Sequence, residues 1–271
     1  MQIKKLYSDS LAFAEKDLKL AFRYKVNFFA QTFLTPLTTV MPFLLVYSGY
    51  FLLGGTQVEN LSDTTFVTFL LIGTIVNITL RLGFNRYLNK FKLEKYWQTL
   101  DAISITPISK LSLILGGMID GLVSVIPGII IISFAAYLFF PTSLAVVLPF
   151  VVLIIFALII SLCLGLIAGL ASIFNENYST IFQYSLLGIV FLSCFFYPIS
   201  FFDNHPILAL LKTIVLINPY YHIVTLMRGV WFGTGFSTQS FIFVSMFVVA
   251  MPFISVALFN WVWKRFTVEG Y

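Results

Sequence analysis

The chain has 271 residues, of which 59% are hydrophobic and only 10% are Asp, Glu, Lys or Arg. A soluble domain is about half apolar and about a quarter charged, so this composition excludes an ordinary soluble enzyme, a nucleic-acid-binding domain and a disordered chain. The net charge of +5 is read as membrane topology, because Lys and Arg collect on the cytoplasmic side of membrane proteins. The apolar length is enough for about six spanning helices of about 20 residues each.

The first predicted element is an amphipathic helix within residues 1–25. Its apolar residues recur at helical spacing and are Leu11, Ala14, Leu18, Ala21 and Phe22. Charged residues run through the same segment, which argues against a cleavable signal peptide. A helix of this kind lies on the membrane surface rather than crossing it. A leader helix packed on another subunit is the alternative.

Six apolar runs follow, separated by polar or irregular breaks. The predicted spans cover about 27–53, 64–84, 108–138, 144–173, 179–200 and 239–262. We therefore expect a single all-α, polytopic membrane domain over residues 1–271. Pro36 and Pro42 lie inside the first run and predict a kink there.

The basic residues predict the orientation of these spans. Fourteen of the sixteen Lys and Arg residues belong to the N-terminal segment, the loop after the second run and the C-terminus. Only Lys212 and Arg228 belong to the opposite side. Six crossings put both chain ends on one side, so the positive-inside rule predicts cytoplasmic N- and C-termini in a cytoplasmic (inner) cell membrane.

The segment 201–238 predicts an outer re-entrant hairpin between the fifth and sixth spans. Residues 207–217 are apolar but reach only about 16 Å as a helix, half of the hydrocarbon core. Asn218 and Pro219 then break the helix before a second short apolar stretch, 220–233. One kinked seventh span is the alternative, but it would put Lys264 and Arg265 outside.

Motifs for catalysis or metal binding are missing from the sequence. It has no HExxH, no GxSxG, no glycine-rich phosphate loop and no Cys/His cluster at metal-ligand spacing. Cys163 and Cys194 lie inside apolar runs and are expected to be small buried residues rather than a disulfide. His205 and His222 are expected to be amphipathic surface residues. We therefore expect no catalytic site, metal or cofactor on this chain.

Asp120 is the clearest ionisable residue within a predicted span, about 12 residues into the third run. A carboxylate at this depth is a candidate for a transport pathway. The alternative is a carboxylate hydrogen-bonded between helices. Ionisable residues are otherwise scarce in the spans, so the chain shows little means of powering transport by itself.

The basic loop 86–107 contains a predicted short amphipathic helix. Leu93, Trp97 and Leu100 share one helical face, while Glu94 and Asp101 lie elsewhere on the same helix. Such a helix fits the groove of a soluble partner. It also fits a helix that lies on the lipid interface with Trp97 as its anchor.

Two stretches resemble the permease subunits of type-2 ABC transporters. The first is EKYWQTLDAISITPISKLSLILGG (94–117), with a charged residue, a Thr-Leu-acidic element and Thr-Pro-hydrophobic-Ser before the third span. The second is FFYPISFFDNHPILALLKTIVLINPYYHIVTLMRGVWFG (195–233). Its matching elements are Tyr197-Pro198, Asn218-Pro219, Tyr220-Tyr221 and Arg228-Gly229. The order and spacing of these elements, more than any one of them, carry the resemblance.

The resemblance implies a fold and a set of partners. It implies an interfacial helix, six spans, an outer hairpin, and pairing with a second copy or a homologue. Two separate ATPase subunits would bind ATP and Mg below the membrane and drive export of an amphipathic substrate such as a drug-like compound, a lipid or a peptide. The coupling helix that meets them would include Leu93, Glu94, Trp97, Leu100 and Asp101.

The same resemblance implies a pathway near spans one, two and five. The candidate pathway residues are Asp120 in the third span and Phe195, Phe196 and Tyr197 at the end of the fifth. Aromatic residues at this depth also form interfacial belts. Permeases for lipid-linked polysaccharides often carry Arg-Tyr-Lys/Arg followed by Leu-Gly-x-x-Trp. This chain has Arg23-Tyr24-Lys25 but neither Leu-Gly nor Trp after it, so polysaccharide export (O-antigen or teichoic-acid type) is an alternative. An integral membrane lipid-modifying enzyme is a more distant one.

Overall fold

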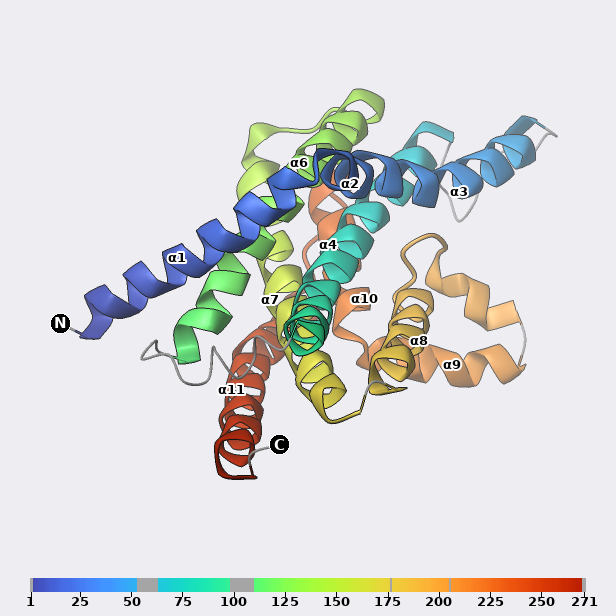
Figure 1. Cartoon of the computed structure of the whole chain (residues 1–271). Coiled ribbons are helices and arrows are strands. Elements are labelled where there is room, and N and C mark those ends of the chain that lie inside the picture. Colours follow the sequence, from blue (N-terminus) through green and yellow to red (C-terminus); the bar gives the residue numbers. More distant parts are fainter. Residues whose placement is uncertain (1, 53–62, 98–109, 176, 205, 270–271) are drawn as a thin grey trace.

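All regular elements are helices in the described part of the computed structural model, which covers residues 2–52, 63–97, 110–175, 177–204 and 206–269 (Figure 1). The α-helices are α1 (Gln2–Arg23), α2 (Lys25–Phe29), α3 (Thr35–Leu52), α4 (Asp63–Tyr96), α6 (Lys110–Phe139), α7 (Val147–Phe174), α8 (Asn177–Phe191), α9 (Pro206–Ile217), α10 (Pro219–Phe232) and α11 (Thr238–Glu269). Three short elements join them, namely the π-helix η1 (Ala30–Leu34) and the 3-10 helices η2 (Leu144–Val146) and η3 (Ile199–Asn204).

Four helical segments are long and apolar enough to cross a membrane, and a fifth is added if a bent pair counts as one span. The four segments are Thr65–Tyr96, Leu111–Phe139, Leu144–Phe174 and Thr238–Val262. They correspond to the second, third, fourth and sixth predicted spans. A multi-pass helical membrane protein is therefore confirmed by helix length and hydropathy.

The first and fifth predicted spans differ from single long helices. The backbone is helical throughout residues 25–52, but the π-helix η1 lies between α2 and α3. The run 179–200 contributes only α8, whose 15 residues reach about 22 Å, which is shorter than the hydrocarbon core. The residues after Phe191 form turns instead of completing that span.

The helix that contains the second predicted span is longer than that span. The span is predicted to end near residue 84, whereas α4 continues to Tyr96. Two of its basic residues have polar neighbours. Nε of Arg81 donates to Oδ1 of Asn77 at 3.1 Å, and the guanidinium of Arg86 pairs with the carboxylate of Asp120 on α6. Arg81 and Arg86 therefore have polar partners within the protein, as charged groups in an apolar environment require.

The core is built around α4, which packs mainly against α7 and α6 (Figure 1). Small residues allow the close approach of α4 and α7. A Cβ atom on Gly165 would lie 2.3 Å from the carbonyl oxygen of Phe84, and one on Gly169 would lie 2.8 Å from that of Tyr87. Glycine at helix crossings lets membrane helices pack backbone to backbone.

The bend predicted within residues 201–238 lies at Asn218 and Pro219, where α9 and α10 meet at 77°. Asn218 has extended backbone geometry and its Oδ1 accepts a hydrogen bond from the Tyr220 amide at 3.0 Å. Pro219 occupies the first helical position, where no amide hydrogen is needed. These two residues therefore end one helix and start the next.

The two chain ends lie in the lower half of Figure 1, as do the start of α6 and the end of α7. The connection from α6 to α7 lies at the top of the same view. The location of both termini on the cytoplasmic side stays a prediction.

Candidate functional site

The strongest candidate site is the end of α4, which we call the α4 tip (residues 93–97). Leu93, Tyr96 and Trp97 present their side chains to the outside, and Tyr96 is 82% exposed. Leu93 and Glu94 belong to the last turns of α4 rather than to a separate helix, and the amide of Trp97 still donates to the Leu93 carbonyl at 2.9 Å. The other two predicted coupling residues, Leu100 and Asp101, lie outside the described residues.

Ion pairs to α1 hold the α4 tip in place. Nζ of Lys16 lies 3.0 Å from Oε1 of Glu94, and Nζ of Lys90 lies 2.5 Å from Oδ2 of Asp17. Lys90 and Asp17 are both nearly buried, so water screens their attraction little. Glu94 is buried against α1 and is therefore not part of the exposed surface of the tip.

A third contact ties the α4 tip to α7. Nζ of Lys95 donates to the carbonyl oxygen of Ile173 at 3.1 Å, near the C-terminal end of α7. A cation is favourable there because the last carbonyls of a helix have no partner within it. The tip is thus braced by two helices while its apolar side chains stay exposed.

The packing of α1 differs from the predicted apolar face. Ser10 and Ala14 are buried, whereas Leu11 and Phe22 are exposed. A Cβ atom on Gly116 of α6 would lie 2.8 Å from the Ser10 carbonyl oxygen, so α1 and α6 touch closely. One face of α1 packs on the protein, and the neighbouring apolar face remains open. On the exposed side of α1, Lys19 lowers the pKa of Glu15 through a hydrogen bond and through its charge.

Asp120 is fully buried, and its carboxylate contacts the guanidinium of Arg86. This is the geometry expected of a carboxylate held between helices. Close by, the Tyr87 hydroxyl donates to the Ile114 carbonyl and links the same pair of helices. Asp120 thus faces α4 and a counter-charge, and its place in a transport pathway stays a prediction.

The aromatic pathway candidates lie in the turns after α8. Phe195 and Phe196 are buried, and the ring of Phe196 stacks on that of Phe43 in α3 at 4.3 Å between centroids. Tyr197 is half-buried, with its ring 5.4 Å from that of Phe201. Within this single chain, Phe195 and Phe196 belong to the core rather than to an open surface.

Arg228 of α10 was named in the sequence only as a basic residue and as part of the Arg-Gly element, and sequence reasoning missed its role in the core. It is buried, and its guanidinium donates to the carbonyls of Cys194 (3.0 Å), Phe195 (2.6 Å) and Phe69 (3.2 Å). It also lies 3.2 Å from the centroid of the Phe69 ring. The sequence does indicate such a role, because Arg228 is the only Lys or Arg in the apolar stretch 220–233. A buried Arg requires several hydrogen-bond acceptors nearby.

The remaining candidates are structural. Cys163 and Cys194 are both free and buried. His222 lies in α10, with Nδ1 3.0 Å from Ser240 Oγ and Nε2 2.8 Å from the Leu216 carbonyl oxygen. His205 lies outside the described residues. Throughout the described ranges, no group of three or more His, Cys, Asp or Glu side chains is placed to hold a metal.

No protein-family model matches this chain, and no curated protein matches it significantly.

Proposed function

We propose that this chain is the transmembrane subunit of an ATP-driven exporter of the type-2 ABC class, with both termini in the cytoplasm. It would pair with a second permease copy or homologue and with two separate ATPase subunits. The substrate class that we propose is an amphipathic molecule, such as a drug-like compound, a lipid or a peptide. The six-span arrangement with an outer re-entrant hairpin belongs to this proposal.

The observation that carries the proposal is the α4 tip. It combines an exposed apolar surface with a rigid support, because Lys90 and Lys95 connect the same helix to α1 and α7. An exposed aromatic and aliphatic cluster on a braced helix end is a surface that a protein groove can bind. Movement of a bound ATPase would pass directly into α4, which is the central helix of the bundle.

The location of the charges supports the same interpretation. The α4 tip lies in the most basic loop of the chain, which the positive-inside rule puts in the cytoplasm, where ATP is found. These 271 residues contain no phosphate-binding loop, which agrees with ATPase subunits as the source of the energy.

The deciding experiment is purification of the intact chain from its own cells in mild detergent. We expect an ATPase subunit with a phosphate-binding loop to co-purify, and we expect the reconstituted complex to hydrolyse ATP with stimulation by substrate. Recovery of the chain without any ATPase, together with activity on lipid, would instead favour the integral membrane enzyme.

The role of the α4 tip is tested by Trp97→Ala and Leu93→Ala in that complex. Removal of an aromatic anchor from a protein interface commonly costs at least about 2 kcal/mol, so we expect at least tenfold weaker ATPase binding for Trp97→Ala. Leu148→Ala is the control, because Leu148 is an exposed leucine on α7, near the α6–α7 connection. Equal ATPase binding by all three variants would contradict the coupling role.

A further inference from the structure

The junction between α1 and α2, which we call the elbow (residues 23–30), contains an open hollow of about 610 Å³. It is lined by Arg23, Tyr24, Lys25, Val26 and Ala30. Its volume lies in the range of small-molecule sites, which is roughly 300–1,000 Å³. Because α1 ends at Arg23 and α2 begins at Lys25, only Tyr24 separates the two helices.

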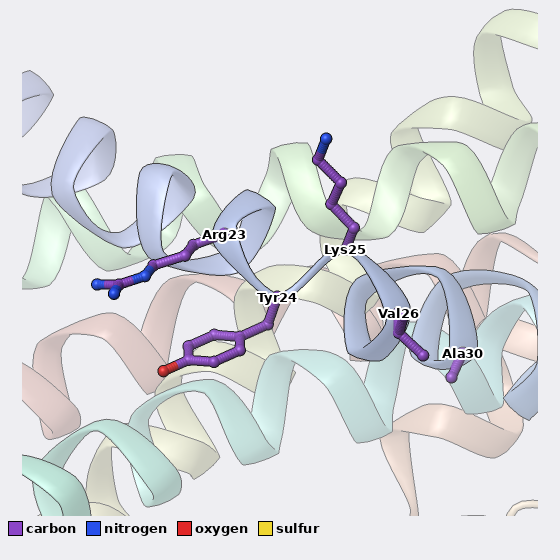
Figure 2. Close-up of a pocket in the computed structure, with 5 residues that line it drawn as sticks. All are labelled: Arg23, Tyr24, Lys25, Val26 and Ala30. Atoms are coloured by element: carbon purple, nitrogen blue, oxygen red, sulfur yellow. The ribbon is translucent and has the colours of Figure 1, made fainter.

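The hollow has a polar end and an apolar end (Figure 2). The Arg23 and Tyr24 side chains extend in the same direction, so that the guanidinium and the phenol hydroxyl both lie at one end. Val26 and Ala30 lie at the other end, and Lys25 extends away from both groups. A ligand that fits this arrangement carries an anion next to a hydrocarbon part.

The polar groups of the elbow are available to a ligand. Tyr24 is 59% exposed, and the side chains of Arg23, Tyr24 and Lys25 form no hydrogen bond or ion pair with any residue that the structure describes. Val26 is 85% exposed, so the apolar end is uncovered as well. Guanidinium groups bind phosphate through paired N–H donors, and a phenol hydroxyl adds another donor.

The sequence puts the elbow at the depth of lipid headgroups. Lys25 is the last charged residue before Glu59, so the chain becomes apolar directly after the elbow. On the other side, α1 carries charges along its whole length. Such a boundary lies at the membrane–water interface, where Tyr is enriched and where the cytoplasmic leaflet displays anionic lipids.

We propose that the elbow binds the headgroup of an anionic phospholipid. The lipid phosphate accepts hydrogen bonds from the Arg23 guanidinium and the Tyr24 hydroxyl, and the adjoining lipid methylenes lie on Val26 and Ala30. Lys25 adds to the positive surface but does not share this phosphate, because its side chain extends the other way. The bound lipid fixes the angle between α1 and the apolar segment after it. This proposal does not depend on transport.

The test is a lipid titration of the purified, delipidated full-length protein in a neutral detergent, with bound lipid counted by native mass spectrometry. Phosphatidylglycerol is the anionic probe, and phosphatidylcholine is the zwitterionic comparison. A basic residue near an anionic surface contributes about 1 kcal/mol, which is roughly a fivefold change in affinity. We therefore expect Arg23→Gln to weaken phosphatidylglycerol binding about fivefold and Arg23→Lys to weaken it less.

Lys4→Gln is the matched control, because it removes the same charge from the other, exposed end of α1. We expect it to bind phosphatidylglycerol like the wild type, and we expect free glycerol phosphate not to displace the lipid. Two results would overturn the proposal. Equal losses in Lys4→Gln and Arg23→Gln would show attraction to general surface charge, and displacement by glycerol phosphate would show a site for a soluble anion.

Discussion

Nη2 of Arg228 lies 2.6 Å from the carbonyl oxygen of Phe195, and this bond connects the bent pair α9–α10 to the turns after α8. The turn needs such support, because Cys194 has a positive φ of 53°, which side-chain-bearing residues adopt rarely. Gly73 of α4 makes room for it, since a Cβ atom there would lie 1.9 Å from the Phe195 oxygen. Arg228 thus provides the hydrogen bonds that a continuing helix would have provided.

The first prediction concerns Arg228→Gln. A glutamine amide cannot reach three carbonyls, and each buried carbonyl left without a donor costs about 1–3 kcal/mol. We expect a lower unfolding temperature in detergent and a loosened turn that exposes Cys194. The measurement is maleimide labelling of Cys194 in a Cys163→Ala background, where the wild-type thiol should stay unlabelled.

Two further variants make that experiment decisive. Arg228→Lys keeps the charge and part of the hydrogen bonding, so its labelling should be intermediate. Lys212→Gln removes a more exposed cation, one that pairs with Asp203 at 2.6 Å, and should leave Cys194 protected. Equal labelling of Arg228→Gln and the wild type would contradict the proposed support.

The second prediction separates the two partners of the buried ion pair. Asp120 is fully buried, whereas the Arg86 side chain is 25% exposed. Arg86→Gln leaves a buried carboxylate without its counter-charge, which costs about 3–5 kcal/mol. Asp120→Asn leaves a cation whose side chain is only partly buried, so the loss in unfolding free energy should be smaller. Thermal or denaturant unfolding of both variants measures the difference.

The double variant and the transport assay complete this test. Since removal of both charges leaves neither one stranded, Arg86→Gln with Asp120→Asn should be more stable than Arg86→Gln alone. Unchanged substrate-stimulated ATPase activity in Asp120→Asn would remove Asp120 from the pathway candidates. A double variant that loses the sum of both single losses would contradict a direct pair.

The features that sequence reasoning could predict are those set by neighbouring residues. The break at Asn218–Pro219 is an example, because a proline and a capping side chain determine it locally. The length of α4 is a contrasting case, because the apolar run predicts a span only to about residue 84 while the helix continues past Arg81 and Arg86 to Tyr96. Their partners come from Asn77, one turn away, and from Asp120, 34 residues away along the chain.

In the candidate site, too, some features depend on neighbouring residues and others on residues that are distant in sequence. Exposure of Leu93 and Trp97 followed from helical spacing, but burial of Glu94 depends on Lys16 in α1. The turn at 194–196 depends on Arg228 and on Gly73, which are distant in sequence. Such long-range acceptor and packing relationships leave no local pattern, so the buried positions of Phe195 and Phe196 could not be predicted.

The third prediction concerns the attachment of α1. The nearly buried pair of Lys90 and Asp17 should contribute more than the exposed pair of Lys19 and Glu15, since exposed pairs contribute about 0–1 kcal/mol. We expect Asp17→Asn to lower the unfolding temperature and Glu15→Gln to leave it unchanged. Charge reversal in Asp17→Lys with Lys90→Asp should recover part of the loss. If Glu15→Gln and Asp17→Asn behave alike, the buried pair has no special role.

The last prediction concerns the buried hydroxyl pair that joins α10 to α7. The hydroxyl oxygens of Tyr220 and Ser161 lie 2.8 Å apart, and Ser161 also donates to the Ala157 carbonyl at 2.6 Å. Ser161 therefore acts as the acceptor, and Tyr220 as the donor. In Ser161→Ala, the Tyr220 hydroxyl loses the acceptor that it uses in a buried site, at a cost of about 1–3 kcal/mol.

In Tyr220→Phe, by contrast, Ser161 keeps its bond to Ala157, so the loss should be only about 1 kcal/mol. We therefore expect Ser161→Ala to be the more destabilising change, although each substitution removes a single hydroxyl oxygen. The double variant should be no less stable than Ser161→Ala, because no hydroxyl is then left without an acceptor. Unfolding of the three variants in one detergent tests this order, and a larger loss in Tyr220→Phe would show that the donor and acceptor roles are reversed.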